Sequence, residues 1–280
     1  MPFHFAFTTV QVLWTLTFAS LLVLLVVLLG RDRAKRYPFF TLGIAIVALR
    51  LLVSRLLFGR LSPLALSVIF YSLAILASLA SLLVVIELAR RAFSGASRRA
   101  WLVTTLLVLA IAVAVLAYWG PWPAWKTLIS GGVLAALRTM ELAGQRGDML
   151  ASLVAVELGI VVALFGRRFH APWRSHTQQL VLGLSTAAIA QLAVRGIWQA
   201  IALKAQVHSQ AEYDRVMNLQ EKLYNANNVL YLLVVIWWIV CMWSDEPGVV
   251  APAASDPAHV DAIAVLDGEG GTQPTVDENS

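Results

Sequence analysis

Charged residues and cysteine are both scarce in this sequence of 280 residues. Charged side chains make up 13% of it and hydrophobic ones 59%, whereas a soluble domain is about a quarter charged and about half apolar. This balance excludes an ordinary soluble domain, a disordered chain and a nucleic-acid-binding protein, although the formal net charge is +5. The single cysteine, Cys241, excludes an internal disulfide framework and a thiolate metal cage.

Catalytic and cofactor motifs are also missing. The five histidines fall outside the long apolar runs, so haem ligation and zinc chemistry within a membrane have no ligands. The sequence has no phosphate-binding loop and no nucleophile elbow, and the last apolar run, 226–243, has no lysine for a retinal Schiff base. It therefore predicts no cofactor, no metal site and no catalytic residue, which favours a protein that is not an enzyme.

What the sequence has instead is long apolar runs. A helix needs about 20 such residues to cross the hydrocarbon core of a bilayer, which is about 30 Å thick. Seven segments reach this length, over about 8–29, 38–59, 64–88, 101–119, 148–166, 178–201 and 226–243. They predict an all-α bundle of seven transmembrane helices, because a spanning backbone must satisfy its own hydrogen bonds. A helical pattern over 127–145 predicts either a separate extracellular helix or an extension of the fifth segment.

Basic residues predict the orientation of this bundle. The first, third and fifth connections hold 11 Lys and Arg, whereas the N-terminus and the longer even connections hold 7. Positive residues collect on the cytoplasmic side, so we expect the N-terminus outside and the C-terminus in the cytoplasm of a bacterium, with the chain in its inner membrane. The first segment runs directly into RDRAKR, which favours a retained span over a cleaved signal peptide.

A change in charge predicts a domain boundary after Ser244. Residues 1–244 hold all 21 Lys and Arg with 8 of the 16 acidic residues, and 245–280 hold the other 8 acidic residues and no Lys or Arg. We expect 1–244 to form the transmembrane domain. The acidic remainder, rich in Pro, Gly and Ala, is expected to be a disordered cytoplasmic tail.

Ionisable side chains at membrane depth are costly and mark candidate sites. The candidate ligand-binding residues are Arg50, Glu157, Gln191, Arg195, Trp198, Asn228 and Tyr231. Two interpretations are open. In the first, Glu157 neutralises Arg50 or Arg195 and only fixes the packing. In the second, these side chains line a cavity open to the outside, where the excess of arginine favours an anionic or carbonyl-rich ligand.

Two further patterns concern packing. Glu87 precedes Arg90 and Arg91 by three and four residues, which predicts a salt bridge at the cytoplasmic boundary of the third segment. Small residues such as Ser78 recur along this segment and predict a central position, because small side chains let membrane helices approach closely. The first segment is uniformly rich in Leu and Val and is expected at the periphery.

Three stretches carry a resemblance to known sequences. They are RYPFF, VVIELARRAF and RTMELAGQRGDMLASLVAVELGIVVALFGRRFHAPWRSHTQQLVLGL. Over most of residues 30–243 the chain resembles a family of uncharacterised bacterial seven-span integral membrane proteins. The resemblance implies the same number of spans and brings no established activity.

These features together favour a membrane protein of the receptor or sensor type, embedded in a lipid bilayer. It would bind a small anionic or lipidic ligand from the outer side and pass a signal to a cytoplasmic partner. A carrier for a small anionic solute and a non-catalytic membrane scaffold are the alternatives, because the number of spans alone does not define function.

Overall fold

The computed structural model describes residues 8–57, 59–93, 98–119, 122, 131–165, 175–204 and 209–245. The chain divides into two compact units, Met1–Ser244 and Asp245–Ser280, and the expected tail lies outside the described residues apart from Asp245. The helices are α1 (Thr9–Gly30), α2 (Arg33–Arg36), α3 (Pro38–Leu57), α4 (Pro63–Ala92), α5 (Arg98–Tyr118), α7 (Val133–Phe165), α8 (His176–Lys204) and α9 (Gln210–Trp243). All regular structure within these ranges is helical.

Six of these helices are long and apolar enough to cross a membrane, namely α1, α3, α4, α7, α8 and α9. The chain is therefore a multi-pass helical membrane protein. The remaining predicted segment corresponds to α5, whose apolar part, Leu102–Tyr118, is shorter than the other six.

Two helices extend well beyond the apolar segments that predict them. α7 begins at Val133 rather than at 148, and α9 begins at Gln210 rather than at 226. The pattern after Val133 therefore belongs to the same helix as the fifth segment, and 127–130 lie outside the described residues. Hydropathy identifies only the apolar part of a helix that suits lipid. The helix itself can continue beyond that part, because its backbone hydrogen bonds also form in water.

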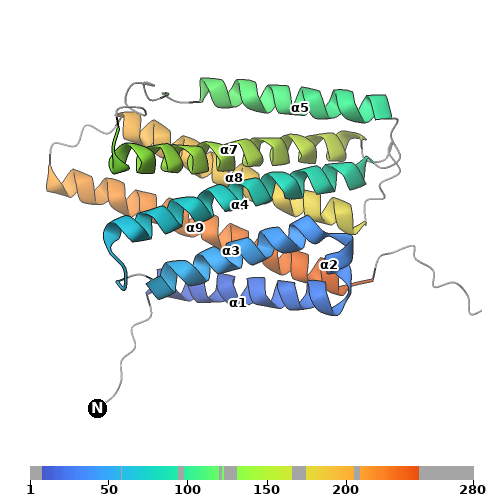
Figure 1. The fold of residues 1–280 in the computed structure, drawn as a ribbon, viewed down its shortest axis with the longest axis horizontal. Coiled ribbons are helices and arrows are strands. Elements are labelled where there is room, and N and C mark those ends of the chain that lie inside the picture. The colour runs from blue at the N-terminus through green and yellow to red at the C-terminus, as the bar shows by residue number, and fades with distance from the viewer. Residues whose placement is uncertain are drawn as a thin grey trace, which may run out of the picture. The chain divides into compact units, whose positions relative to one another are not determined.

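The six long helices form a ring in the order α1, α3, α4, α7, α8, α9 and back to α1, with each member packed on the next (Figure 1). Helices that follow one another in the chain run in opposite directions. α5 lies outside this ring and packs against α7. Among the described side chains of α5, only Ala112 is buried.

Small residues allow the closest approaches within the ring. A Cβ atom at Gly147 would lie 3.1 Å from Ser78 Cβ, and one at Gly159 would lie 2.5 Å from Ser185 Cβ. The Ser78 hydroxyl is buried and donates to the Gly144 carbonyl oxygen at 3.1 Å. α4 packs against α3, α7 and α8, which is the central position that its small residues predict.

The first helix is less peripheral than its sequence indicates. Leu21, Leu24 and Leu28 are fully buried, and α1 packs on both α3 and α9. A helix made almost entirely of Leu and Val has no small or polar residues to mark its packing face, so the face is set by its neighbours.

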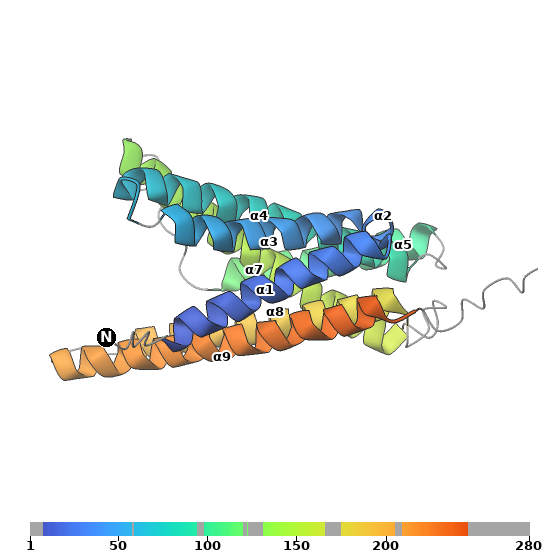
Figure 2. The same ribbon diagram turned by 90° about the horizontal axis from the view of Figure 1, so that it is seen from below.

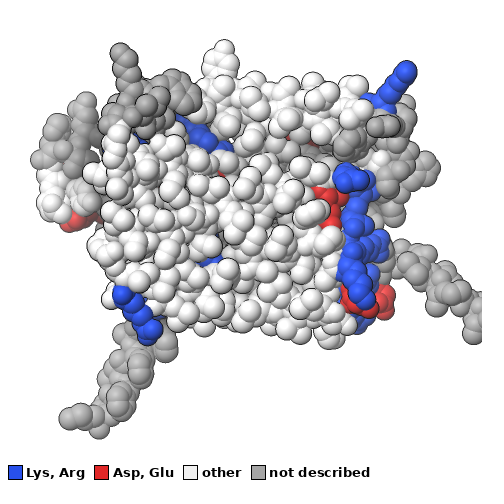
Figure 3. Space-filling view, in the orientation of Figure 1, with Lys and Arg blue, Asp and Glu red and all other residues white. Residues whose placement is uncertain are grey.

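Basic side chains gather at one end of the bundle, along the right edge of Figure 3. The described basic residues of the connections and helix ends there are Arg31, Arg33, Lys35, Arg36, Arg90, Arg91 and Arg99. We term this the basic end, and the opposite one the far end. α1, α4, α7 and α9 run towards the basic end, and α3, α5 and α8 start there.

Candidate functional site

A cavity of about 350 Å³ lies within the ring of six helices. Every helix of the ring contributes to its lining, from Thr17 of α1 to Trp238 of α9. Small-molecule sites usually measure about 300–1,000 Å³, so this space is large enough for a ligand. We term it the central cavity.

Polar and apolar linings separate along the length of the central cavity. Towards the far end the lining is polar, with Arg50, Asp148, Ser152, Gln191, Asn227, Asn228 and Tyr231. Towards the basic end it is apolar, with Phe40, Ile44, Val84, Val85, Leu184 and Trp238. The rings of Phe40 and Trp238 meet edge to face at 5.1 Å. Arg50 and Phe40 are ten residues apart on α3, which corresponds to about 15 Å along the helix.

The side of the central cavity formed by α7 and α8 carries a hydrogen-bonded polar cluster. Asp148 Oδ2 accepts a hydrogen bond from Gln191 Nε2 at 2.6 Å and forms an ion pair with Arg195. Ser152 Oγ donates to Gln191 Oε1 at 3.4 Å, and Arg195 Nη1 donates to the Gln145 carbonyl oxygen at 3.3 Å. These polar groups satisfy one another, and we term this side the α7–α8 wall.

The side formed by α3 and α9, with α1 between them, is different. Arg50, Asn227, Asn228 and Tyr231 line it, and none of their side chains has a hydrogen bond or ion pair with any residue that the structure describes. Arg50 and Asn228 are exposed, so the cavity reaches the surface beside them. Guanidinium, amide and phenol groups all donate hydrogen bonds. This side, the α3–α9 wall, therefore offers free donors to a ligand.

The predicted ligand-binding residues fall into two groups. Arg50, Gln191, Asn228 and Tyr231 line the central cavity, and Gln191 belongs to the satisfied cluster. Glu157, Arg195 and Trp198 do not line it. Sequence reasoning missed Asp148, Ser152 and Asn227.

The first interpretation, in which Glu157 neutralises Arg50 or Arg195, is wrong. Arg195 pairs with Asp148 instead, and Glu157 Oε2 is buried without a hydrogen-bond partner among the described residues. The apolar segment begins at residue 148, which suggests that Asp148 meets water. Because α7 begins at Val133, Asp148 lies in the middle of a helix and faces α8.

A spacing in the sequence could have shown this contact. Asp148 and Ser152 are four residues apart, as are Gln191 and Arg195, so each pair lies on one face of its helix. The two helices run antiparallel, and carboxylate and hydroxyl groups then meet amide and guanidinium groups. Complementary polar pairs of this kind predict a helix–helix contact.

Below the floor of the central cavity, Glu87 connects α4 to the start of α3. Its Oε2 accepts a hydrogen bond from the Phe40 backbone N at 2.9 Å, and its Oε1 lies 3.7 Å from Arg91 Nη2. The Arg91 guanidinium also lies 4.9 Å from the centre of the Tyr37 ring. Arg90 is exposed and forms no ion pair within the described ranges. Glu87 thus satisfies one of the free N–H groups at the first turn of α3.

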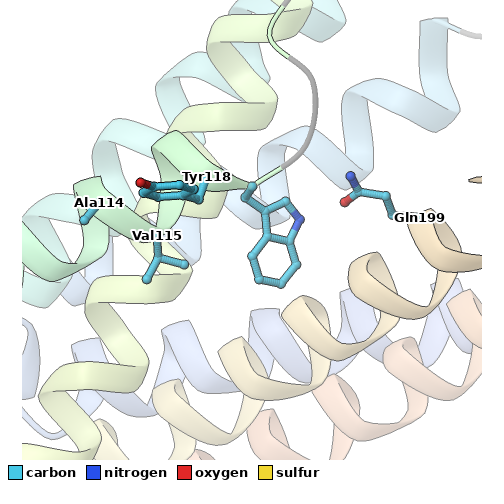
Figure 4. A pocket seen from close by; sticks show the side chains of 5 residues that line it. Ala114, Val115, Tyr118 and Gln199 are labelled. Carbon is cyan, nitrogen blue, oxygen red and sulfur yellow. The ribbon is translucent and has the colours of Figure 1, made fainter.

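A second pocket lies outside the ring, between α5 and α8 (Figure 4). It is lined by Ala114, Val115, Tyr118, Trp119 and Gln199. Tyr118 is 93% exposed, and no charged side chain lines this surface. In the described part of the chain, no group of three or more His, Cys, Asp or Glu could hold a metal ion. The central cavity is the candidate site because every helix of the ring lines it and Arg50 and Asp148 bring charged side chains to it.

Comparison of the chain with protein-family models, with curated proteins and with solved structures gives no match.

Proposed function

We propose that this chain is a seven-helix integral membrane protein of the receptor or sensor type, which binds a small anionic ligand in the central cavity. The observation that carries the proposal is Arg50, a charged side chain that lines the cavity without a partner among the described residues. Arginine at membrane depth is almost always paired. A carboxylate or phosphate fits the paired donors of its guanidinium group, and would supply the missing negative charge.

Several features support the orientation in which the basic end is cytoplasmic. Lys and Arg accumulate on the cytoplasmic side of membrane proteins, and α5 would be the seventh span. The N-terminus is then outside, the mouth of the cavity opens outwards, and 245–280 form a cytoplasmic tail. The resemblance to bacterial seven-span proteins supports an inner-membrane location. A cytoplasmic partner would meet the basic end.

The contact of Phe40 with Glu87 supports a signalling role. Phe40 lines the floor of the cavity, and its backbone N–H is held by Glu87 at the basic end. A ligand that displaces Phe40 would therefore change this contact. A carrier would need a path past Phe40 and Trp238, which are each 2% exposed. A scaffold would not account for the unpartnered Arg50.

Binding to the reconstituted full-length chain tests the proposal. The protein would be placed in phosphatidylcholine nanodiscs and titrated with methyl phosphate and with dodecyl phosphate, and thermal stabilisation would be measured. We expect stabilisation by at least one probe for the wild type and for the matched control Arg55→Met, which alters an exposed arginine of α3 outside the cavity. Arg50→Met should reduce it strongly at the same probe concentration. Absence of stabilisation by both probes would overturn the proposal.

Two further measurements address the mode of action and the orientation. The bound probe should not accumulate in proteoliposomes, and accumulation would show a carrier instead. A reporter that fluoresces only in the cytoplasm, fused after Ser244, should be bright. An active periplasmic phosphatase at the same position would reverse the orientation.

A further inference from the structure

The lining of the central cavity is complementary to a ligand with two chemically different ends. The free donors of Arg50, Asn227, Asn228 and Tyr231 lie towards the far end. The floor, with Phe40, Val84 and Trp238, is mainly apolar, and Phe40 and Trp238 are almost completely buried; its polar groups are the Ser81 hydroxyl and Trp238 Nε1, which has no partner among the described residues. A small and fully polar anion would satisfy the first set and leave the floor unfilled. An apolar chain attached to the anion would fill it.

The dimensions limit this ligand to one chain. The polar and apolar ends are about 15 Å apart along α3. The volume of about 350 Å³ is near the lower limit for sites of drug-sized molecules, about 300 Å³. A volume near this lower limit favours a single chain over the two chains of a phospholipid.

The burial of α1 and α3 shows where the ring is open. All buried residues of α1 lie from Thr17 onwards, and the preceding turns have none. All buried residues of α3 lie before Leu49, and none follows. The two helices therefore pack together near the basic end and diverge towards the far end, as Figure 2 shows. Thr17, Arg50 and Leu51 line the cavity where this divergence begins.

We infer that the ligand is a single-chain anionic amphiphile that enters sideways from the membrane, between α1 and α3, and places its anionic head at Arg50 and its chain against Trp238. The inference rests on the proposed function and adds the class of ligand and its route. An opening between two apolar helices faces lipid, so a molecule dissolved in the bilayer reaches it directly. Arg50 is exposed in the outer half of its helix, where its long stem can carry the guanidinium group to a lipid headgroup.

Affinity and chain position are tested with four probes on the full-length chain in phosphatidylcholine nanodiscs. These are dodecyl phosphate, dodecyl phosphate brominated at the end of the chain, methyl phosphate and dodecanol. Dodecyl phosphate should bind at least about tenfold more tightly than methyl phosphate, because every buried methylene group adds to affinity. It should also bind more tightly than dodecanol, and Arg50→Met should remove this advantage. The brominated probe should quench tryptophan fluorescence less in Trp238→Phe than in the wild type.

The outcomes separate the inference from the proposed function. Equal, Arg50-dependent affinity for methyl phosphate and dodecyl phosphate would overturn the amphiphile and leave the anion site intact. No Arg50-dependent binding of either phosphate, or equal affinity for dodecanol and dodecyl phosphate, would overturn both. Equal quenching in Trp238→Phe and the wild type would place the chain elsewhere and also overturn the inference. The affinity comparison decides independently if Trp238→Phe does not fold.

The lateral route is tested with a matched pair of variants on α3. Leu51 lines the cavity beside the opening, whereas Leu49 is 46% exposed and lies outside the cavity. Leu51→Phe should slow the association of membrane-dissolved dodecyl phosphate several-fold, and Leu49→Phe should leave the rate unchanged. Equal rates in these two variants and the wild type would overturn the lateral route.

Discussion

The two walls of the central cavity use the same kinds of side chain in opposite ways. On the α7–α8 wall, Asp148, Gln191 and Arg195 satisfy one another. On the α3–α9 wall, Arg50 and Tyr231 line the cavity and have no partner among the described residues. Polar groups at membrane depth are costly in both positions. On the α7–α8 wall, hydrogen bonds and an ion pair within the protein offset this cost. On the α3–α9 wall, only water or a ligand can offset it.

This difference predicts which residues affect stability and which affect binding. A substitution in the α7–α8 wall leaves a former partner unpaired and should destabilise the fold. A substitution in the α3–α9 wall leaves no unpaired partner. Its effect should appear in the affinity for an anion.

The largest expected effect is that of Asp148→Leu, which leaves both Arg195 and Gln191 without an acceptor. Breaking a fully buried pair costs about 3–5 kcal/mol. The side chains of Arg195 and Asp148 are 30% and 34% exposed, so we expect a loss of about 2–4 kcal/mol in the free energy of unfolding. Denaturant unfolding in mixed micelles would measure it.

The double variant Asp148→Leu with Arg195→Met is the control for this prediction. It removes both charges and should recover most of the lost stability. If the double variant is as unstable as the sum of the single variants, the cluster is not a coupled unit.

Arg50→Met tests the opposite wall. Its unfolding free energy should change by less than about 0.5 kcal/mol, because an exposed residue without partners is removed. The affinity for dodecyl phosphate should fall roughly 10-fold to 150-fold, as expected for a hydrogen bond to a charged group of about 1.5–3 kcal/mol. A loss of stability comparable to that of Asp148→Leu would remove the distinction between the walls.

The α7–α8 wall is supported from behind by the contact of α7 with α4. Ser78 is 4% exposed and lies against Gly144 and Gly147, so Ser78→Leu should overpack this contact and cost about 1–3 kcal/mol. Thermal unfolding in detergent, with Val23→Leu as the control, would show this. Val23 is 49% exposed on α1, and its enlargement should be tolerated.

The smallest expected effect is that of Tyr231→Phe, which removes one hydroxyl group from the α3–α9 wall. One neutral hydrogen bond contributes about 0.5–1.5 kcal/mol, so affinity for dodecyl phosphate should fall roughly 2-fold to 10-fold. The melting temperature of the unliganded protein should stay the same. A drop in melting temperature with unchanged affinity would mean that the hydroxyl group serves packing.

The sequence predicts the position of a residue along its helix better than the neighbour that its side chain faces. Hydropathy places α1, α3, α4 and α8 within a few residues of their observed ends, because these helices consist mainly of apolar residues. It also brings Arg50, Glu157 and Gln191 to similar depths. Depth follows from position along a helix, at about 1.5 Å per residue.

Which neighbour a side chain faces depends on how the helices are rotated, and depth does not contain that information. Glu157 has a suitable depth for Arg50 but does not line the cavity, and its Oε2 is buried without a hydrogen-bond partner among the described residues. Because the apolar segment begins at residue 148, the sequence alone does not suggest that Asp148 faces α8. Asn227 also precedes Tyr231 by four residues, as Asn228 does by three, so the face of α9 that lines the cavity is wider than a single row.

The length of α9 has a practical consequence for imaging. Its 34 residues correspond to about 51 Å, and a bilayer core takes up only about 30 Å. About 20 Å of continuous helix therefore stands clear of the hydrophobic layer at the far end. A compact soluble protein joined in helical register to Gln210 would be held rigidly by this projection. Such a fusion would give a small membrane protein the external mass that particle alignment in electron cryomicroscopy requires.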